Sequence, residues 1–302
     1  MSLLTSILLT DILPVFLIAA AGFLLGRFAG VQVGTVVRVV FYSLMPCLAF
    51  KMLATSSASG PNVGKLVLLV VLQMGTMGLI GLAAAKVVGL DGRTLRAFLM
   101  VVMFSNAGNY GLPVVQFAFG QEALTYATVF FIGGSVTTYT VSSFFAGSHR
   151  KALAGALEKI WKMPALYGLA AAAIVLWLDV PVPDALMRPV TLLSDAAIPV
   201  MILVLGMQLE RAVWPPRPGL VLLAVGISLL IAPLVALGMT SALGLEGPAR
   251  QAGVVLSSMP VAVVTIILAL EFELSPEFVT SAVFVSTLAS PLTLTPLIAY
   301  LS

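Results

Sequence analysis

Long apolar stretches follow one another along almost the whole chain, and only short polar breaks separate them. A membrane-spanning helix needs about 20 mostly apolar residues to cross about 30 Å of hydrocarbon. Ten stretches satisfy this requirement: 5–26, 34–54, 64–89, 94–118, 122–146, 163–179, 188–209, 218–243, 248–270 and 277–300. The pattern therefore predicts an all-α integral membrane protein with ten transmembrane helices.

The composition agrees with a membrane protein and argues against several other classes. Hydrophobic residues make up 60% of the chain and charged residues only 9%, whereas a soluble domain carries about 25% charged residues. The basic residues are scattered, which argues against a nucleic-acid partner. Cys47 is the one cysteine and His149, in a polar loop, is the one histidine, so we expect no metal site, no cofactor and no enzyme activity. The first stretch lacks a basic leader and a clear cleavage site, and we expect it to remain as a span.

The longest polar break divides the chain into two halves of five spans each. We predict a first repeat at 1–146, a cytoplasmic connecting loop at 147–162 and a second repeat at 163–302. Because five is an odd number, a second half with the same fold would enter the membrane upside down, as an inverted repeat. Eleven of the fifteen Lys and Arg residues lie in or beside the odd-numbered connections. The odd connections should therefore be cytoplasmic, with both termini outside.

Two predicted spans are interrupted by helix-breaking residues, at 105–113 in the fourth span and at 257–260 in the ninth. Backbone that leaves the helix at membrane depth must be buried in protein or line a cavity. Asn106 lies ten residues after Arg96, and Pro260 lies ten residues after Arg250, which is about 15 Å of helix from the start of each span. We therefore predict two broken helices that cross near the bilayer midplane and form a transport site.

The first break has the richer chemistry. Gly111 permits unusual backbone angles, and Pro113 removes a donor and disfavours helix before it. The freed N–H groups of the second half-helix can hold a carboxylate, and Asn106 and Asn109 add amide groups. Tyr110 either stacks on a flat ligand or packs against protein. The alternative for the whole break is a kinked helix whose polar groups bond to neighbouring helices.

The second break offers Ser257 and Ser258, whose hydroxyls satisfy freed backbone or touch a ligand. Met259, beside Pro260, either forms an adaptable apolar wall or faces lipid or the protein core. Asp195 is the one carboxylate well inside a predicted span. Buried acids in membranes are costly. Asp195 therefore couples protons to transport or coordinates a cation, or else it caps backbone around Pro199 near the outer interface.

Glycines in the first and third predicted spans suggest close helix packing. They form the motif Gly22-x-x-x-Gly26 and the series Gly75, Gly78 and Gly81.

Two segments resemble the auxin efflux carrier family. Asn106-x-x-Asn109-Tyr110-Gly111-Leu112-Pro113 is similar to the family's fourth-span signature, and 195–209 is similar to its seventh span. The short polar break after the fifth span is typical of bacterial members. The resemblance implies the fold of bile-acid sodium symporters, with helices crossing at Pro113 and Pro260 and a substrate carboxylate near Asn109. It also implies elevator-like movement and homodimers in the cytoplasmic membrane.

Together these features predict a secondary carrier for a small organic anion, with the lipid bilayer and a second copy of the chain as partners. The candidate binding residues are Asn106, Asn109, Tyr110, Gly111, Pro113, Ser257, Ser258, Met259 and Pro260. A channel-like permease or a membrane sensor with the same crossover site is the alternative.

Overall fold

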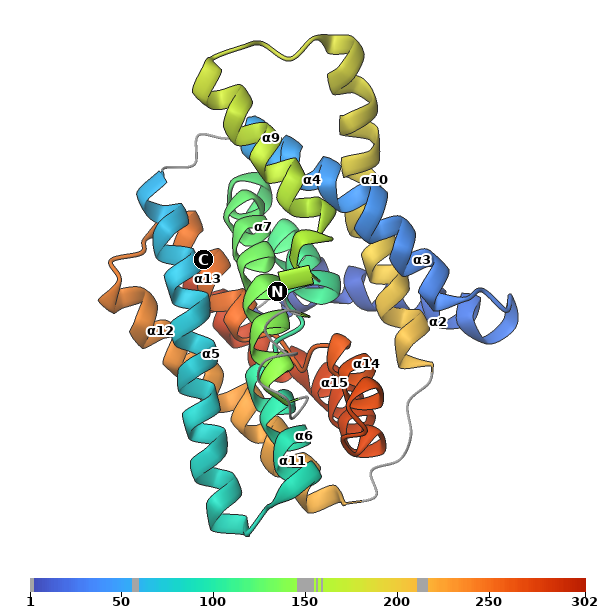
Figure 1. Cartoon of the computed structure of the whole chain (residues 1–302), viewed down its shortest axis with the longest axis vertical. Helices are drawn as coiled ribbons and strands as arrows, with labels where there is room; N and C mark the ends of the chain where they lie inside the picture. The colour runs from blue at the N-terminus through green and yellow to red at the C-terminus, as the bar shows by residue number, and fades with distance from the viewer. Residues whose placement is uncertain (1–2, 56–59, 146–154, 156, 159, 211–216) are drawn as a thin grey trace.

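The structure is a computed structural model that describes residues 3–55, 60–145, 155, 157–158, 160–210 and 217–302 (Figure 1). These residues are helical throughout their regular structure, apart from one isolated β-bridge. The predicted all-α fold is therefore confirmed for this part of the chain. Most of the predicted connecting loop 147–162, with His149, lies outside the described residues.

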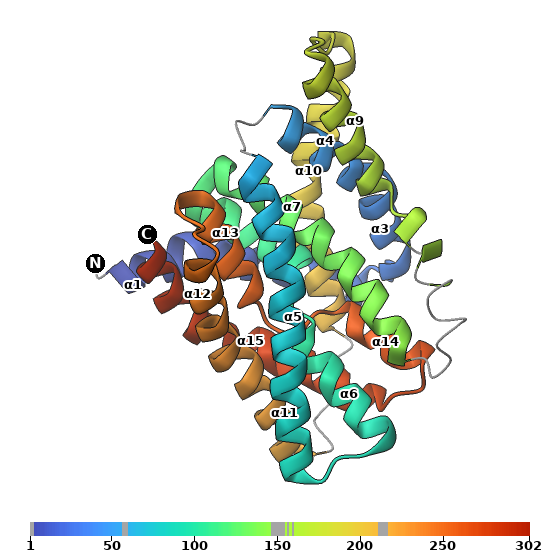
Figure 2. The same cartoon turned by 60° about the vertical axis from the view of Figure 1, so that its left-hand side comes forward.

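The helices pack as two bundles according to their contacts, and most of the first bundle lies towards the upper right of both views (Figures 1 and 2). The first bundle contains α2 (Leu13–Phe28), α3 (Val33–Val39), α4 (Met45–Ala54), α9 (Pro164–Leu178) and α10 (Asp184–Leu209). The second bundle contains α5 (Gly60–Val88), α6 (Gly92–Met103), α7 (Leu112–Phe145), α11 (Pro218–Gly226), α12 (Ala232–Ala242), α13 (Gly247–Ser257), α14 (Val264–Glu271) and α15 (Pro276–Leu301). The short α1 (Leu3–Ile7) contacts α15, so the first and last helices lie side by side.

Six of the ten predicted spans appear, within the described part of the chain, as helices long and apolar enough to cross a membrane. These are Leu3–Phe28, Val33–Ala54, Pro61–Val88, Asp184–Leu209, Pro218–Ala242 and Pro276–Leu301. The predicted spans 94–118 and 248–270 are each split into two short helical pieces, as their breaks require. The predicted span 122–146 is the later part of α7, which Gly120 kinks with a φ of 76°. The predicted span 163–179 is the shorter apolar helix α9.

In the part of the chain that the structure describes, four spans contain a wide π-helical turn that ends two residues before a proline. The turns are η1 (Leu8–Ile12), η2 (Val40–Leu44), η3 (Ala107–Gly111) and η4 (Ile227–Ile231). In each case the second residue after the turn is a proline, namely Pro14, Pro46, Pro113 or Pro233. Proline lacks the N–H that bonds back along the helix, and its ring crowds the preceding turn. The wider turn makes room for the ring, so these spans continue past their prolines.

Close glycine contacts join α2 to α10 in the first bundle. A β-carbon on Gly22 would overlap the backbone of Leu203, and one on Gly206 would overlap the carbonyl oxygen of Ala19. The close packing predicted at Gly22 is confirmed. Gly75 is different, because no atom of the described chain lies within 4 Å of the place where its β-carbon would be.

Candidate functional site

The two predicted breaks meet and bind each other through their backbones. The N–H of Asn106 donates to the carbonyl of Pro260 at 2.7 Å, and the N–H of Ala262 donates to the carbonyl of Phe104 at 2.8 Å. Ser105 and Val261 form an antiparallel β-bridge between these bonds. The crossover thus gives four freed backbone groups partners inside the protein, as burial away from water demands.

The first break is short, because helix resumes soon after α6 ends at Met103. Phe104 is extended, with φ −104° and ψ 108°, and η3 already begins at Ala107. The second break is longer, since α13 ends at Ser257 and α14 begins at Val264. Here the N–H of Val261 also donates to Ser286 Oγ at 3.1 Å.

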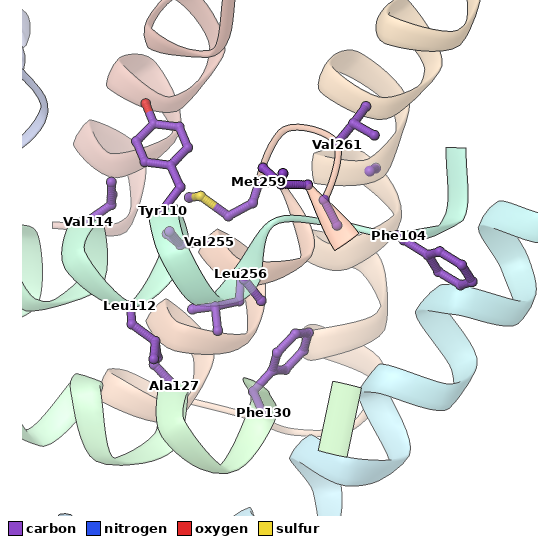
Figure 3. Packing of buried hydrophobic residues seen from close by; sticks show 14 of the residues in the cluster. Phe104, Tyr110, Leu112, Val114, Ala127, Phe130, Val255, Leu256, Met259 and Val261 are labelled. Carbon is purple, nitrogen blue, oxygen red and sulfur yellow. The ribbon is translucent and has the colours of Figure 1, made fainter. Parts of the chain in front are cut away.

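Tight packing surrounds the crossover (Figure 3). A β-carbon on Gly108 would lie 2.6 Å from the Phe131 ring, and one on Gly111 would lie 3.1 Å from the Met259 side chain. Glycine is therefore the residue that lets the first break approach its neighbours so closely.

Tyr110 packs inside the protein and lies away from the candidate cavity. Its side chain is fully buried, Ser290 Oγ–H donates to its hydroxyl at 3.0 Å, and its ring meets the edge of Phe16. These contacts correspond to the packing alternative that the sequence left open. Other candidates that do not line the cavity are Gly111, Pro113, Ser258, Met259 and Pro260. Ser258 donates to the carbonyl of Val254, which is the backbone role considered for it.

A cavity of about 500 Å³ lies beside the crossover. Of the predicted binding residues, it brings together Asn106, Asn109 and Ser257. It is also lined by Gln73 of α5 and Gln208 of α10, which the sequence analysis did not select. Both glutamines lie within long apolar stretches, and this rarity of intramembrane polar side chains is the signal that could have identified them.

Two half-helices begin at this cavity. Ala107, Gly108 and Asn109 line it at the start of the helix that follows the first break, and Ala262, Val263 and Val264 line it at the start of α14. The first N–H groups of a helix lack partners within the helix, and each helix start carries a partial positive charge of about half a unit. The crossover therefore presents two positive helix ends to one space.

Three buried polar atoms of residues that line the cavity have no hydrogen-bond partner in the described part of the chain. They are Gln73 Oε1, Asn106 Nδ2 and Ser257 Oγ, on residues no more than 6% exposed. Gln73 Nε2 donates to the carbonyl of Ala232 at 3.1 Å, which directs its oxygen elsewhere. Buried polar groups nearly always have partners, so one acceptor, one donor and one hydroxyl are left here for water or a ligand.

Much of the rest of the cavity wall is apolar. It includes Val70, Met74, Met77, Met103, Phe130, Phe131, Ile267 and Leu268. Methionine side chains are flexible and adapt to different ligand shapes. A bound molecule would therefore place a polar group at the crossover and less polar atoms along this wall.

The other end of the cavity reaches the surface beside charged side chains. Arg38, Lys162 and Glu271 line it, and all three are exposed. Lys162 donates to Glu158 at 2.6 Å. This hydrogen bond lowers the pKa of the Glu158 carboxyl and raises the pKa of the Lys162 amine. The charged side chains of the cavity thus lie at its surface end, away from the crossover, which has no charged side chain.

Asp195 lies outside the cavity, on α10. Its carboxylate forms an ion pair with Lys51 at 2.6 Å; the Asp195 side chain is 62% exposed and that of Lys51 18% exposed. Among the described residues, no three His, Cys, Asp or Glu side chains come together in a way that could hold a metal ion.

Comparison with known proteins places this geometry in a family. The family described as "Membrane transport protein" matches residues 7–155 and 147–298. An uncharacterized transporter of Methanothermobacter thermautotrophicus is 29% identical over 92% of this chain and 93% of its own length. The uncharacterized transporter MJ1031 of Methanocaldococcus jannaschii is 24% identical, over 83% of both chains. The chain therefore belongs to the membrane transport protein family, which is the family of the auxin efflux carriers.

Proposed function

We propose that this protein is a secondary carrier that moves a small organic anion, a carboxylate, across the cytoplasmic membrane. The observation that carries the proposal is the convergence of two helix N-termini and the Asn109 side chain on one cavity. That cavity reaches the surface beside Arg38 and Lys162, which would attract an anion.

The electrostatics of the crossover favour an anion over a cation. Helix N-termini bind carboxylates and phosphates through their free N–H groups, without a formal positive charge nearby. Among the described residues that line the cavity, the one carboxylate is Glu271, at the opposite, exposed end. A cation at the crossover would face two positive helix ends and no acid.

The proposal includes an inverted repeat of residues 1–146 and 163–302. The arrangement of the bundles supports it: each half contributes its first two spans to the first bundle and its last three to the second. Movement of the second bundle against the first would carry the crossover across the membrane. We also propose that the chain forms a homodimer.

The orientation of the protein is part of the proposal. Both termini would lie outside, which agrees with the contact between α1 and α15. Arg38, Lys162 and Glu271 all belong to predicted cytoplasmic connections or the span ends beside them. The structure would then represent a state in which the cavity is open to the cytoplasm.

We expect Asn109→Ala to weaken carboxylate binding by about tenfold or more, because a hydrogen bond to a charged group contributes about 1.5–3 kcal/mol. The measurement is saturable uptake and counterflow of radiolabelled acetate, malonate, succinate and benzoate in proteoliposomes. Asn62→Ala is the matched control, because Asn62 does not line the cavity.

Unchanged uptake kinetics in Asn109→Ala would contradict the assignment of the site. Counterflow separates the carrier from the alternatives: a channel-like permease would conduct without saturation or counterflow, and a sensor would bind the anion without moving it.

Asp195→Asn tests proton coupling in the same proteoliposomes, by uptake with and without a pH gradient. We expect the dependence on the gradient to persist, because Asp195 lies outside the cavity and already pairs with Lys51. Loss of the gradient dependence would instead assign proton coupling to Asp195.

A further inference from the structure

One hydrogen bond connects the first break directly to the first bundle. Asn109 Nδ2 donates to Gln208 Oε1 at 3.3 Å, and both side chains are half-buried in the wall of the cavity. Asn109 belongs to the π-helical turn η3, and Gln208 is the penultimate residue of α10. The two residues thus join elements of different bundles.

The Gln208 amide oxygen resembles one oxygen of a carboxylate. Both are planar sp² acceptors, and the negative end of the Gln208 amide faces the positive start of a helix. Asn109 Nδ2 carries two N–H donors, and Gln208 accepts from one of them. A ligand carboxylate that accepts from this N–H must take the place of the Gln208 oxygen. Gln208 and the ligand compete for the same donor.

The backbone of Gln208 is held in place by its neighbours. Two residues earlier, Gly206 packs directly against the backbone of α2, where even a β-carbon would overlap Ala19. Residue 208 therefore cannot follow Asn109 if the second bundle moves. The hydrogen bond must break, either when a ligand displaces it or when the bundles shift.

We propose that Gln208 is a ligand-displaced latch: it occupies one N–H donor of Asn109 in the empty protein and ties the crossover to α10 until an anion takes that donor. This inference rests on the proposed function, because it places the ligand carboxylate at Asn109. It assigns Gln208 as a positioning residue that tunes affinity and favours movement of the loaded over the empty carrier.

Gln208→Leu tests the latch, because leucine keeps much of the side-chain volume and removes the acceptor. Binding is measured with the panel carboxylate that wild-type protein binds best. Its dissociation constant should fall about two- to tenfold in Gln208→Leu, the range for one neutral hydrogen bond. Net flux should rise relative to counterflow, since the empty carrier is no longer held. Gln208→Glu should raise the dissociation constant at least about tenfold, because its charge binds Asn109 and repels the anion.

A second measurement needs no ligand. Hydrogen–deuterium exchange in residues 105–111 of the empty protein should become faster in Gln208→Leu, while α2 and α10 keep their protection. Gln251→Leu is the matched control, because Gln251 donates to the carbonyl of Leu301 and does not line the cavity. It should change neither affinity nor exchange in 105–111.

The outcomes separate this inference from the proposed function. If wild-type protein binds none of the carboxylates, the proposed function is wrong and the latch falls with it. If wild-type protein binds but Gln208→Leu leaves affinity unchanged or weakens it, the latch alone is wrong, and a weakened affinity would make Gln208 a direct ligand contact. Unaltered exchange in residues 105–111 would also contradict the latch.

Discussion

Gly206→Val should prevent the protein from reaching its folded state. Any side chain at this position overlaps the carbonyl oxygen of Ala19. Gly22 of α2 lies similarly close to the backbone of Leu203 on α10. Overpacking a tight core costs about 1–3 kcal/mol when side chains can shift, and more is expected here because the obstacle is backbone. We expect a loss of at least about 3 kcal/mol, seen as aggregation during size-exclusion chromatography and loss of a cooperative thermal transition.

Gly75→Ala is the control for this prediction. Gly75 lies in the interior of α5 with no neighbouring atom of the described chain within 4 Å of its β-carbon position. Alanine is favoured over glycine in a helix interior by about 1 kcal/mol, so this variant should be as stable as the wild-type protein or slightly more stable. Normal folding of Gly206→Val would show that α2 and α10 can separate without loss of the fold.

Ala262→Pro should abolish transport and destabilise the crossover. The proline removes the N–H that donates to Phe104 at 2.8 Å and leaves that buried carbonyl without its partner. An unsatisfied buried backbone group costs about 1–3 kcal/mol, to which the clash of the ring with the opposing extended segment at Phe104 adds. We expect no measurable uptake and a thermal transition lowered by several degrees.

Ala262→Gly is the matched control, because it loses the methyl group and keeps the N–H. It should cost about 1 kcal/mol, the usual penalty for glycine flexibility, and uptake should persist. Equal effects of the two substitutions would show that the methyl group, and not the backbone bond, holds the crossover together.

The main features of the crossover could be predicted from the sequence because they are local. Helix breakers within an apolar stretch, such as Pro113 and Pro260, mark both breaks, and burial of freed backbone requires that they find partners. The predicted contact between the breaks is confirmed by the bonds of Asn106 and Ala262. The same stretches also contain the polar side chains predicted to bind a ligand, such as those of Asn106 and Asn109.

The direction of each side chain could not be predicted in the same way. Tyr110 follows Asn109 directly, yet it turns to Ser290 and Phe16 while Asn109 turns to Gln208. Which face of a short π-helical turn meets a cavity depends on helices far away in the sequence. Gln208 was missed for the same reason: it joins the site through the packing of α10, about a hundred residues after the motif that marks the crossover.

The crossover bonds have a consequence for how such a site can change in evolution. The two hydrogen bonds between the breaks are made by main-chain atoms of Phe104, Asn106, Pro260 and Ala262. They persist with any side chain that leaves the donating N–H of residues 106 and 262 in place, which excludes only proline. Substitutions at Ser105, Asn106 or Ser257 can therefore alter the chemistry of the cavity while the joint between the half-helices persists. A lineage of such proteins could acquire new substrates one residue at a time without first rebuilding its fold.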